Sequence, residues 1–154
     1  MQKRWVRMLL WGTTIAVMLM IAWFSSQNGE KSNKMSDGVV DSVLGNVQQD
    51  ATAEDTLQLR KRLVTIVRKG AHIMEYALLG VSLCLLHMSY AARYGALRAW
   101  GIASVYGALD EVHQLFSEGR AGRITDILID ASGAAIGVLA VVWLAHMAAK
   151  KRAD

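Results

Sequence analysis

Proline is absent from this sequence, and cysteine occurs once among its 154 residues. Because proline is the usual cause of a sharp break in a helix, we expect any helices to be straight and uninterrupted. The single cysteine, Cys84, has no partner for a disulfide, so packing alone must hold the fold. Cys84 lies inside an apolar run, where we interpret it as a small apolar filler.

A concentrated positive charge is also missing. The formal net charge is +4, but the 17 Lys and Arg residues are scattered among 13 Asp and Glu residues, and no recognition motif accompanies them. We therefore expect no nucleic-acid partner. A small positive charge instead suits a protein beside anionic lipid headgroups, which makes the lipid bilayer the expected partner.

Several stretches of the chain contain little or no charge. Hydrophobic residues make up 53% of the sequence, which is high for a soluble protein, and the length allows one domain. The segment from Met8 to Phe24 has no charged residue, and its length nearly spans a hydrocarbon core of roughly 30 Å. The basic start, with Lys3, Arg4 and Arg7, also fits a signal peptide, but the apolar run is long for one and has a poor cleavage site.

We predict an all-α protein whose single domain, residues 1–154, is a four-span transmembrane helical bundle. The predicted spans cover about residues 8–24, 71–88, 97–116 and 127–147, the second being the end of a longer helix that begins near Thr56. Because the connections between the second and third spans and between the third and fourth spans are short, neighbouring helices should be antiparallel, as in an up-and-down bundle. Basic residues are nearly balanced between the two faces, so we place both termini in the cytoplasm on the strongly basic start of the first helix.

A polar segment, residues 25–62, separates the first and second spans and is predicted to be largely a loop. Within it, apolar residues recur at helical spacing after Ser36 and Asp37, a plausible helix cap. They are Val39, Val40, Val43, Leu44 and Val47. We predict a short amphipathic helix here, which lies on the membrane surface, covers the mouth of the bundle or packs against the loop.

Ionisable and amide residues gather at one end of three predicted spans. An ionised side chain inside a span costs roughly 2.5 to 3.5 kcal/mol unless it is paired or lines a polar cavity. The up-and-down topology brings the three groups to one membrane face, the outer one if both termini are cytoplasmic. The groups are Lys69, His72 and Glu75; Asp110, Glu111, His113 and Gln114; and Arg120, Arg123, Asp126 and Asp130. The sequence therefore predicts one polar pocket.

The fourth span shows which way its carboxylates point. Asp126, Asp130, Gly133 and Gly137 fall on a single helical face. The two glycines form a GxxxG contact surface, which faces another helix rather than lipid. We therefore expect both carboxylates to point into the bundle.

The residues of the predicted pocket are assigned by their chemistry. His72, Glu75, Asp110 and Glu111 are candidates for general acid and base catalysis. The candidate substrate-binding residues are Lys69, His113, Gln114, Arg120, Arg123, Asp126 and Asp130, and the arginines suit a phosphate or a carboxylate. A divalent metal ion held by His72, Glu75, Asp110 and His113 is a further hypothesis, although no standard zinc motif is present.

Some of these residues also have purely structural interpretations. Lys69 and Glu75 could form an ion pair within one helix, and Asp126 could cap the start of the fourth span. Arg120 and Arg123 could contact lipid headgroups. Because buried polar groups sometimes only fix helix register, a membrane scaffold is a third alternative beside an enzyme and a binding protein.

The motifs that contain these residues resemble those of the VanZ-like family of small bacterial membrane proteins. They are Phe24–Gln27, Arg68–Tyr76, Asp110–Phe116, Gly119 with Arg120, and Asp126 with Asp130–Gly133. The resemblance implies a multi-pass protein of the bacterial cytoplasmic membrane, related to one associated with teicoplanin resistance, and it leaves the mechanism open. We expect the pocket to act on a lipid-linked or cell-wall component, or to bind a headgroup, a cell-wall precursor or a glycopeptide without reaction.

Overall fold

The structure is a computed structural model that describes residues 2–27, 29–44, 53–116 and 123–153. These residues form five α-helices. They are α1 (Gln2–Ser25), α2 (Gly29–Leu44), α3 (Ala53–Ser89), α4 (Gly95–Gln114) and α5 (Ile124–Ala153). No strand occurs in the described ranges, which confirms the all-α prediction.

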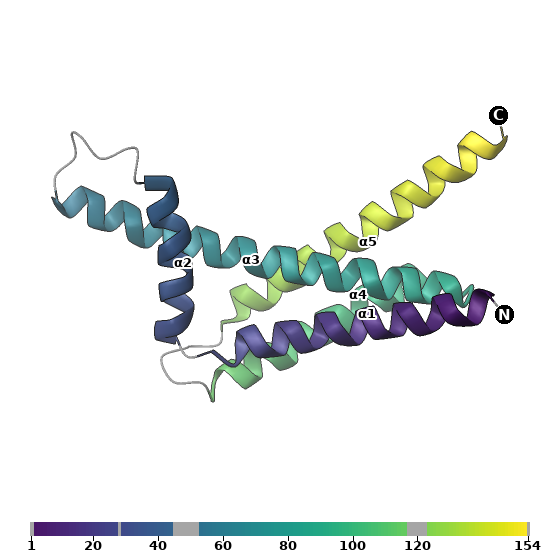
Figure 1. The fold of residues 1–154 in the computed structure, drawn as a ribbon, viewed down its shortest axis with the longest axis horizontal. Coiled ribbons are helices and arrows are strands. Elements are labelled where there is room, and N and C mark those ends of the chain that lie inside the picture. The colour runs from purple at the N-terminus through teal and green to yellow at the C-terminus, as the bar shows by residue number, and fades with distance from the viewer. Residues whose placement is uncertain (1, 28, 45–52, 117–122, 154) are drawn as a thin grey trace.

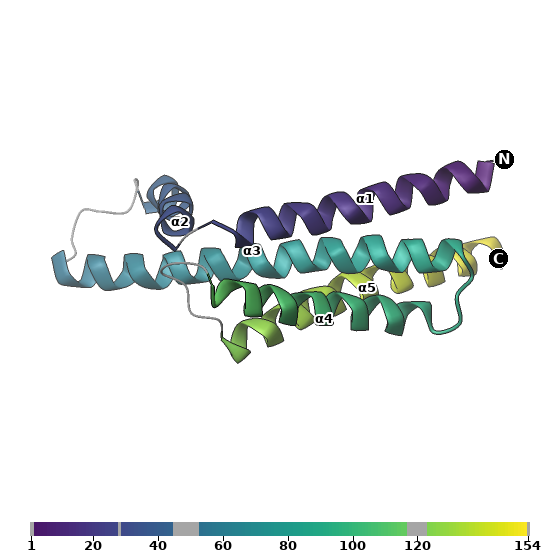
Figure 2. The same cartoon turned by 90° about the horizontal axis from the view of Figure 1, so that it is seen from below.

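Four of the helices run along the length of the molecule, and α2 lies across them near one end (Figure 1). Successive long helices, α1, α3, α4 and α5, alternate in direction, so both termini lie toward the opposite end (Figures 1 and 2). Each of the other helices contacts α3. The antiparallel order expected from the short connections is therefore present.

Three helices are long and apolar enough to cross a membrane, within the described part of the chain. The candidate spans are Arg4–Ser25, Leu57–Ser89 and Ile124–Ala153, in α1, α3 and α5. The predicted count of four is therefore corrected to three on this criterion. The predicted span at 97–116 fails because α4 carries Arg98, Asp110 and Glu111 within only 20 residues.

The outer surfaces of these helices fit a membrane protein. Large apolar side chains point away from the bundle, among them Leu9 and Leu19 of α1 and Leu139 and Trp143 of α5. Only 17% of the candidate span in α1 is buried inside the molecule. Apolar surface of this extent is costly in water and favourable against lipid tails.

The segment 25–62 is mostly helical, so the predicted loop is wrong. It contains all of α2 and the first part of α3, which begins at Ala53 and so confirms the longer helix expected near Thr56. The amphipathic helix is confirmed, but it begins at Gly29, so Ser36 and Asp37 lie inside it rather than at its cap. Of its apolar stripe, Val40 is buried and Val39 exposed, and Val47 lies outside the described residues.

Contacts with α3 explain why so polar a segment is helical. Arg60 of α3 pairs with Asp37 at 3.2 Å and with Asp41 at 3.0 Å, two residues one turn apart on α2. Val40, between them in sequence, is 1% exposed. Short helices usually depend on such tertiary contacts rather than on their own propensity, which is why composition alone predicted a loop.

Glycines allow α3 and α5 to cross at close range. A Cβ atom on Gly133 would lie 2.6 Å from the carbonyl oxygen of Ile73. A Cβ atom on Gly137 would overlap the backbone of Ala77, and one on Gly80 would overlap the backbone of Ala134. The predicted GxxxG contact surface is therefore confirmed, with α3 as its partner.

Apolar packing and hydrogen bonds hold α4 against the other helices. Ala99 and Ala103 of α4 are fully buried in the core, as is Cys84 of α3, which agrees with its interpretation as a filler. The Tyr106 hydroxyl donates to the Met18 carbonyl at 2.7 Å, and Trp100 Nε1 donates to the Ala131 carbonyl at 3.0 Å. These bonds connect α4 with α1 and α5.

Candidate functional site

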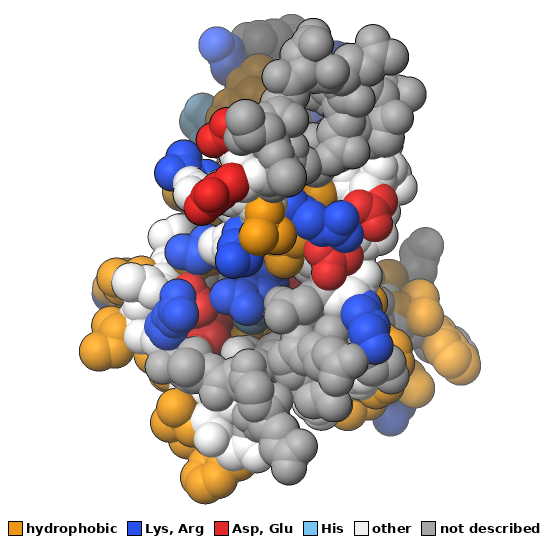
Figure 3. Space-filling model, turned by 90° about the vertical axis from the view of Figure 1, so that its left-hand side faces the viewer, with side chains coloured by type: hydrophobic (Ala, Val, Ile, Leu, Met, Phe, Trp, Pro, Cys, Tyr) orange, Lys and Arg blue, Asp and Glu red, His pale blue; other side chains and the backbone are white. Residues whose placement is uncertain are grey.

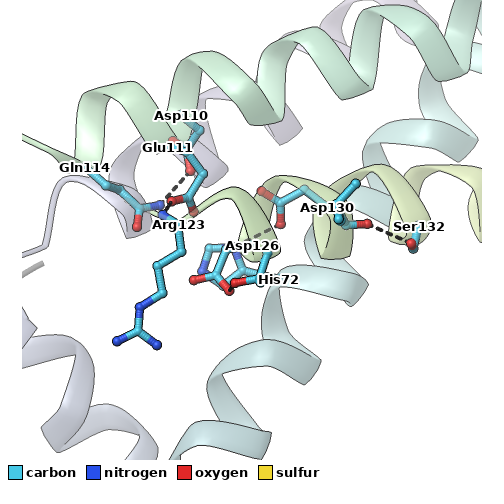
Figure 4. A network of polar contacts seen from close by, with 10 residues as sticks. His72, Asp110, Glu111, Gln114, Arg123, Asp126, Asp130 and Ser132 are labelled. Carbon is cyan, nitrogen blue, oxygen red and sulfur yellow. Dashed lines mark hydrogen bonds and ion pairs between the residues drawn. The ribbon is translucent and has the colours of Figure 1, made fainter. Parts of the chain in front are cut away.

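Polar side chains meet at the end of the bundle where α4 ends and α5 begins. This is the end that α2 crosses (Figure 1), and Lys, Arg, Asp and Glu side chains gather on its surface (Figure 3). His72 of α3, Asp110 and Glu111 of α4, and Asp130 of α5 approach one another inside it (Figure 4). The structure therefore brings residues from all three predicted groups together.

His72 and Asp130 form a polar contact between α3 and α5. Nδ1 of His72 lies 3.2 Å from Oδ1 of Asp130. The Asp130 side chain is completely buried, whereas 17% of the His72 side chain is exposed. Gly107 of α4 leaves room for this carboxylate, because a Cβ atom there would lie 3.0 Å from the Cβ of Asp130. Asp130 thus points into the bundle, as the GxxxG face predicts.

Glu111 connects α4 with the start of α5. Its Oε2 accepts a hydrogen bond from the backbone N–H of Arg123 at 2.9 Å. A carboxylate suits this position, because the first N–H groups of a helix lack partners within the helix. Asp126 is not the cap that the sequence suggested, since α5 begins at Ile124 and Asp126 lies inside its first turn. Its negative charge is still favourable there.

Two buried carboxylate oxygens have no hydrogen-bond partner among the described residues. They are Oδ2 of Asp130 and Oε1 of Glu111. By contrast, Asp110 accepts a hydrogen bond from Nε2 of Gln114 at 2.9 Å. Buried carboxylate oxygens are normally paired, so the two exceptions mark the interior of this cluster as incomplete.

Three side chains of the cluster offer a compact set of donor atoms. One atom each from His72, Glu111 and Asp130 lies within 4.8 Å of the other two. This set shares only His72 with the hypothesised metal site of His72, Glu75, Asp110 and His113. The sequence could not identify this set, because depth in the bundle depends on how the helices cross.

A cavity of about 260 Å³ adjoins this cluster. Its polar lining includes His72, Glu75, Asp110 and Arg68, and its apolar lining includes Val67. The remaining lining residues come from the end of α1, from α2 and from α3: Phe24, Ser25, Gln27, Met35, Ser36, Val39 and Ala71. One cavity is thus lined by both charged and apolar side chains.

The other predicted site residues lie outside the buried cluster. His113 is exposed and lines a second cavity of about 170 Å³ with Tyr106 and Asp110. The guanidinium of Arg123 points away from the carboxylates (Figure 4), and Lys69 is half-buried. Arg120 lies outside the described residues.

The sequence prediction did not assign Arg68 to the pocket, although Arg68 belongs to the Arg68–Tyr76 motif. Arg68 lies four residues before His72, so both belong to one face of α3, and this spacing could have identified it. The part that α2 takes in the lining agrees with one of the positions expected for the amphipathic helix, over the mouth of the bundle (Figure 1).

Comparison with known families agrees with the motifs in the sequence. The model of the VanZ/LLP1 family matches residues 10–145. The chain belongs to the VanZ/LLP1 family. The match contains every residue of the buried cluster and of the cavity lining, so both lie within the VanZ/LLP1 domain. No curated protein and no solved structure is significantly similar to the chain.

Proposed function

We propose that this VanZ/LLP1 protein binds the polar head of a lipid-linked cell-wall component in the cavity between α1, α2, α3 and α4. The observation that carries the proposal is the mixed lining of the cavity, which includes both charged and apolar side chains. A free polar molecule would leave Phe24 and Val67 facing water, whereas an apolar molecule would desolvate Glu75 and Asp110 without replacing their hydrogen bonds. An amphiphile can contact both the charged and the apolar lining residues favourably.

The charged lining residues, Arg68, Glu75 and Asp110, suit a phosphorylated or hydroxylated head. The guanidinium of Arg68 can donate paired hydrogen bonds to a phosphate or carboxylate oxygen. The carboxylates of Glu75 and Asp110 can accept hydrogen bonds from hydroxyl, amide or ammonium groups. Sugar-peptide heads linked to lipid through phosphate carry all of these groups.

The direction of the helices supports a location at the outer face of the bacterial cytoplasmic membrane. We propose that α4 also crosses the membrane, beside α3 and α5, although it falls outside the hydropathy criterion. Its Asp110 and Glu111 are 7% and 3% exposed, so the bundle shields them from lipid. Four crossings leave both termini on one side, which the basic start of α1 favours as the cytoplasm. In this orientation α2 lies along the outer face of the cytoplasmic membrane.

Cysteine labelling tests this topology. Phe116, at the end of α4 near the site, is 85% exposed, whereas Arg93 lies exposed in the turn between α3 and α4. In intact cells, we expect a membrane-impermeant maleimide to label F116C and not R93C, and to label both after the cells are opened. The native Cys84 is fully buried and should stay unlabelled.

Two results of this labelling would contradict the proposed topology. If R93C alone reacts in intact cells, the site faces the cytoplasm. If both cysteines show the same accessibility, α4 does not cross the membrane.

A substitution that fills the cavity tests the binding proposal. Val67 lines the cavity, whereas its neighbour Ile66 is 63% exposed and does not. We expect V67W to weaken binding at least about tenfold, because its indole would occupy the space that the ligand needs and cost at least about 1.4 kcal/mol of binding free energy. I66W, the matched control, should bind like the wild type. Native mass spectrometry with a polyprenyl phosphate, a lipid-linked peptidoglycan precursor and phosphatidylglycerol measures this.

The relative affinities for the three lipids show which of them supplies the head that the cavity binds. Preference for the lipid-linked precursor supports the proposal, whereas equal binding of phosphatidylglycerol indicates a general headgroup site and overturns it. Equal losses in V67W and I66W would place binding outside the cavity.

In cells, we expect the intact chain to lower teicoplanin susceptibility relative to the null strain and V67W to restore it. Equal susceptibility in all strains would end the proposed link to resistance.

A reaction on the bound component is the second candidate function. The observation that favours it is the contact between His72, which lines the cavity, and the buried carboxylate of Asp130. A buried carboxylate fixes the orientation of an imidazole ring, an arrangement that enzymes use for proton transfer and for metal binding. An enzyme would show turnover of the bound component that H72Q abolishes without loss of binding.

A further inference from the structure

We propose that His72, Glu111 and Asp130 form a binding site for one divalent transition-metal ion of the Zn²⁺ or Mn²⁺ class. Each residue comes from a different helix, α3, α4 or α5 (Figure 4). One imidazole and two carboxylates form a donor set that these ions accept. The site does not depend on the ligand proposed for the cavity.

The spacing of the donor atoms supports an ion. Two ligand atoms that each lie about 2.0 Å from a tetrahedral metal ion are about 3.3 Å apart. Nδ1 of His72 and Oδ1 of Asp130 are 3.2 Å apart. One donor atom from each of the three residues lies within 4.8 Å of the other two, so modest side-chain movements would bring them around one ion.

The unpartnered carboxylate oxygens are an independent indication of a missing ligand. Oδ2 of Asp130 and Oε1 of Glu111 have no hydrogen-bond partner in the described part of the chain, and their residues are 0% and 3% exposed. Burying such an oxygen without a partner is unfavourable, and burying a charge is more so. A cation bound by Asp130 and Glu111 would supply a counter-charge for both carboxylates and a partner for the oxygens that coordinate it.

No described lysine or arginine offers an alternative counter-charge. Asp130 pairs only with His72 among the described residues, and the described ion pairs do not include Glu111. Arg123 contributes its backbone N–H to Glu111, while its guanidinium points away (Figure 4). This hydrogen bond orients the carboxylate, as partners of metal ligands commonly do.

The position of the ion would give it a role in the cavity. His72 belongs both to the donor set and to the cavity lining. A metal ion with three protein ligands keeps an open coordination position, which a phosphoryl or carbonyl oxygen can fill. The ion would therefore bind or polarise the head of a molecule in the cavity.

Metal content and metal titration test the site directly. Tag-free protein is purified in detergent without chelator, and its metals are measured by inductively coupled plasma mass spectrometry. We expect one Zn²⁺ or Mn²⁺ per chain. After chelator treatment, either ion should raise the midpoint of thermal unfolding, and calorimetry should show one site with at least about tenfold preference over Ca²⁺.

Matched substitutions connect the ion to the three residues. We expect H72Q and E111Q to lose the ion and its thermal shift, whereas H146Q and E54Q, which change exposed side chains, retain both. If E111Q fails to fold, E111D keeps the charge but withdraws the donor atom, and should weaken binding at least about tenfold.

Two outcomes would overturn the proposal. The first is folded wild-type protein that holds no ion and shows no shift with either metal, which would mean that protons or Arg120 neutralise the carboxylates. The second is equal metal content in H72Q, E111Q and the controls, which would show an adventitious ion elsewhere. Neither outcome would affect binding by the cavity.

Discussion

G137A is expected to destabilise the bundle by about 1 to 3 kcal/mol, although alanine is the better helix former. A Cβ atom at Gly137 would overlap the backbone of Ala77, and backbone atoms cannot move aside as the end of a flexible side chain can. Helices α3 and α5 would have to separate along their whole crossing. G137L should be worse still and leave little folded protein.

The matched control makes the same chemical change on another helix. Gly101 of α4 has no atom within 4 Å of where a Cβ would lie. G101A should therefore leave stability unchanged or raise it by up to about 1 kcal/mol, because glycine weakens a helix. Unfolding by sodium dodecyl sulfate in mixed micelles, followed by circular dichroism, measures both. Equal effects in the two variants would show that the α3–α5 crossing is not as close as described.

H72L is expected to reduce the free energy of unfolding by about 3 to 5 kcal/mol when Asp130 is ionised. Asp130 is fully buried, and His72 is its hydrogen-bond partner. Removing one member of a buried pair leaves the other without compensation, whereas replacing both with apolar residues is often neutral. The double variant H72L/D130L should therefore recover most of the loss. Measurements in the presence of a chelator exclude any contribution from bound metal.

H87L is the control for this prediction. His87 lies on the same helix and donates from Nδ1 to the Leu83 carbonyl, four residues away, with no buried charge as partner. Its replacement should cost no more than about 1.5 kcal/mol. The prediction fails if H72L and H87L are equally stable, or if the double variant is no more stable than H72L.

The sequence was sufficient to place the site at one end of the bundle. Short connections fix the direction of successive helices, and Gly133 with Gly137 shows which face of α5 is buried. Asp130, on that face, therefore had to point inward. These inferences depend only on helix geometry, which is local and regular.

The partners within the site could not be predicted in the same way. Asp130 was assigned to substrate binding, but it is completely buried and bonded to His72. Glu111 reaches the N–H of Arg123, a contact that depends on how closely α4 and α5 approach. Such pairings depend on crossing angles and on translations of a few ångströms, which no spacing in the sequence encodes.

Polar composition was misleading for α2. Composition predicted a loop on both sides of a short amphipathic helix, yet residues 29–44 form one helix against α3, with Val40 buried and Arg60 paired with Asp37 and Asp41. The start of α5 shows a similar limit. Asp126 has the chemistry of a cap but lies inside the first turn, and Glu111, twelve residues before Arg123, accepts the hydrogen bond from the backbone N–H just ahead of α5.

The order in which the helices are synthesised decides when the polar cluster acquires its partners. Helices enter the membrane in chain order, so His72 arrives before the helix that carries its partner Asp130. Until α5 is inserted, His72 lacks this partner and Glu111 lacks the N–H of Arg123. The last helix to be synthesised therefore completes the polar cluster. A chain that ends before α5 would leave the side chains of His72 and Glu111 without these hydrogen-bond partners.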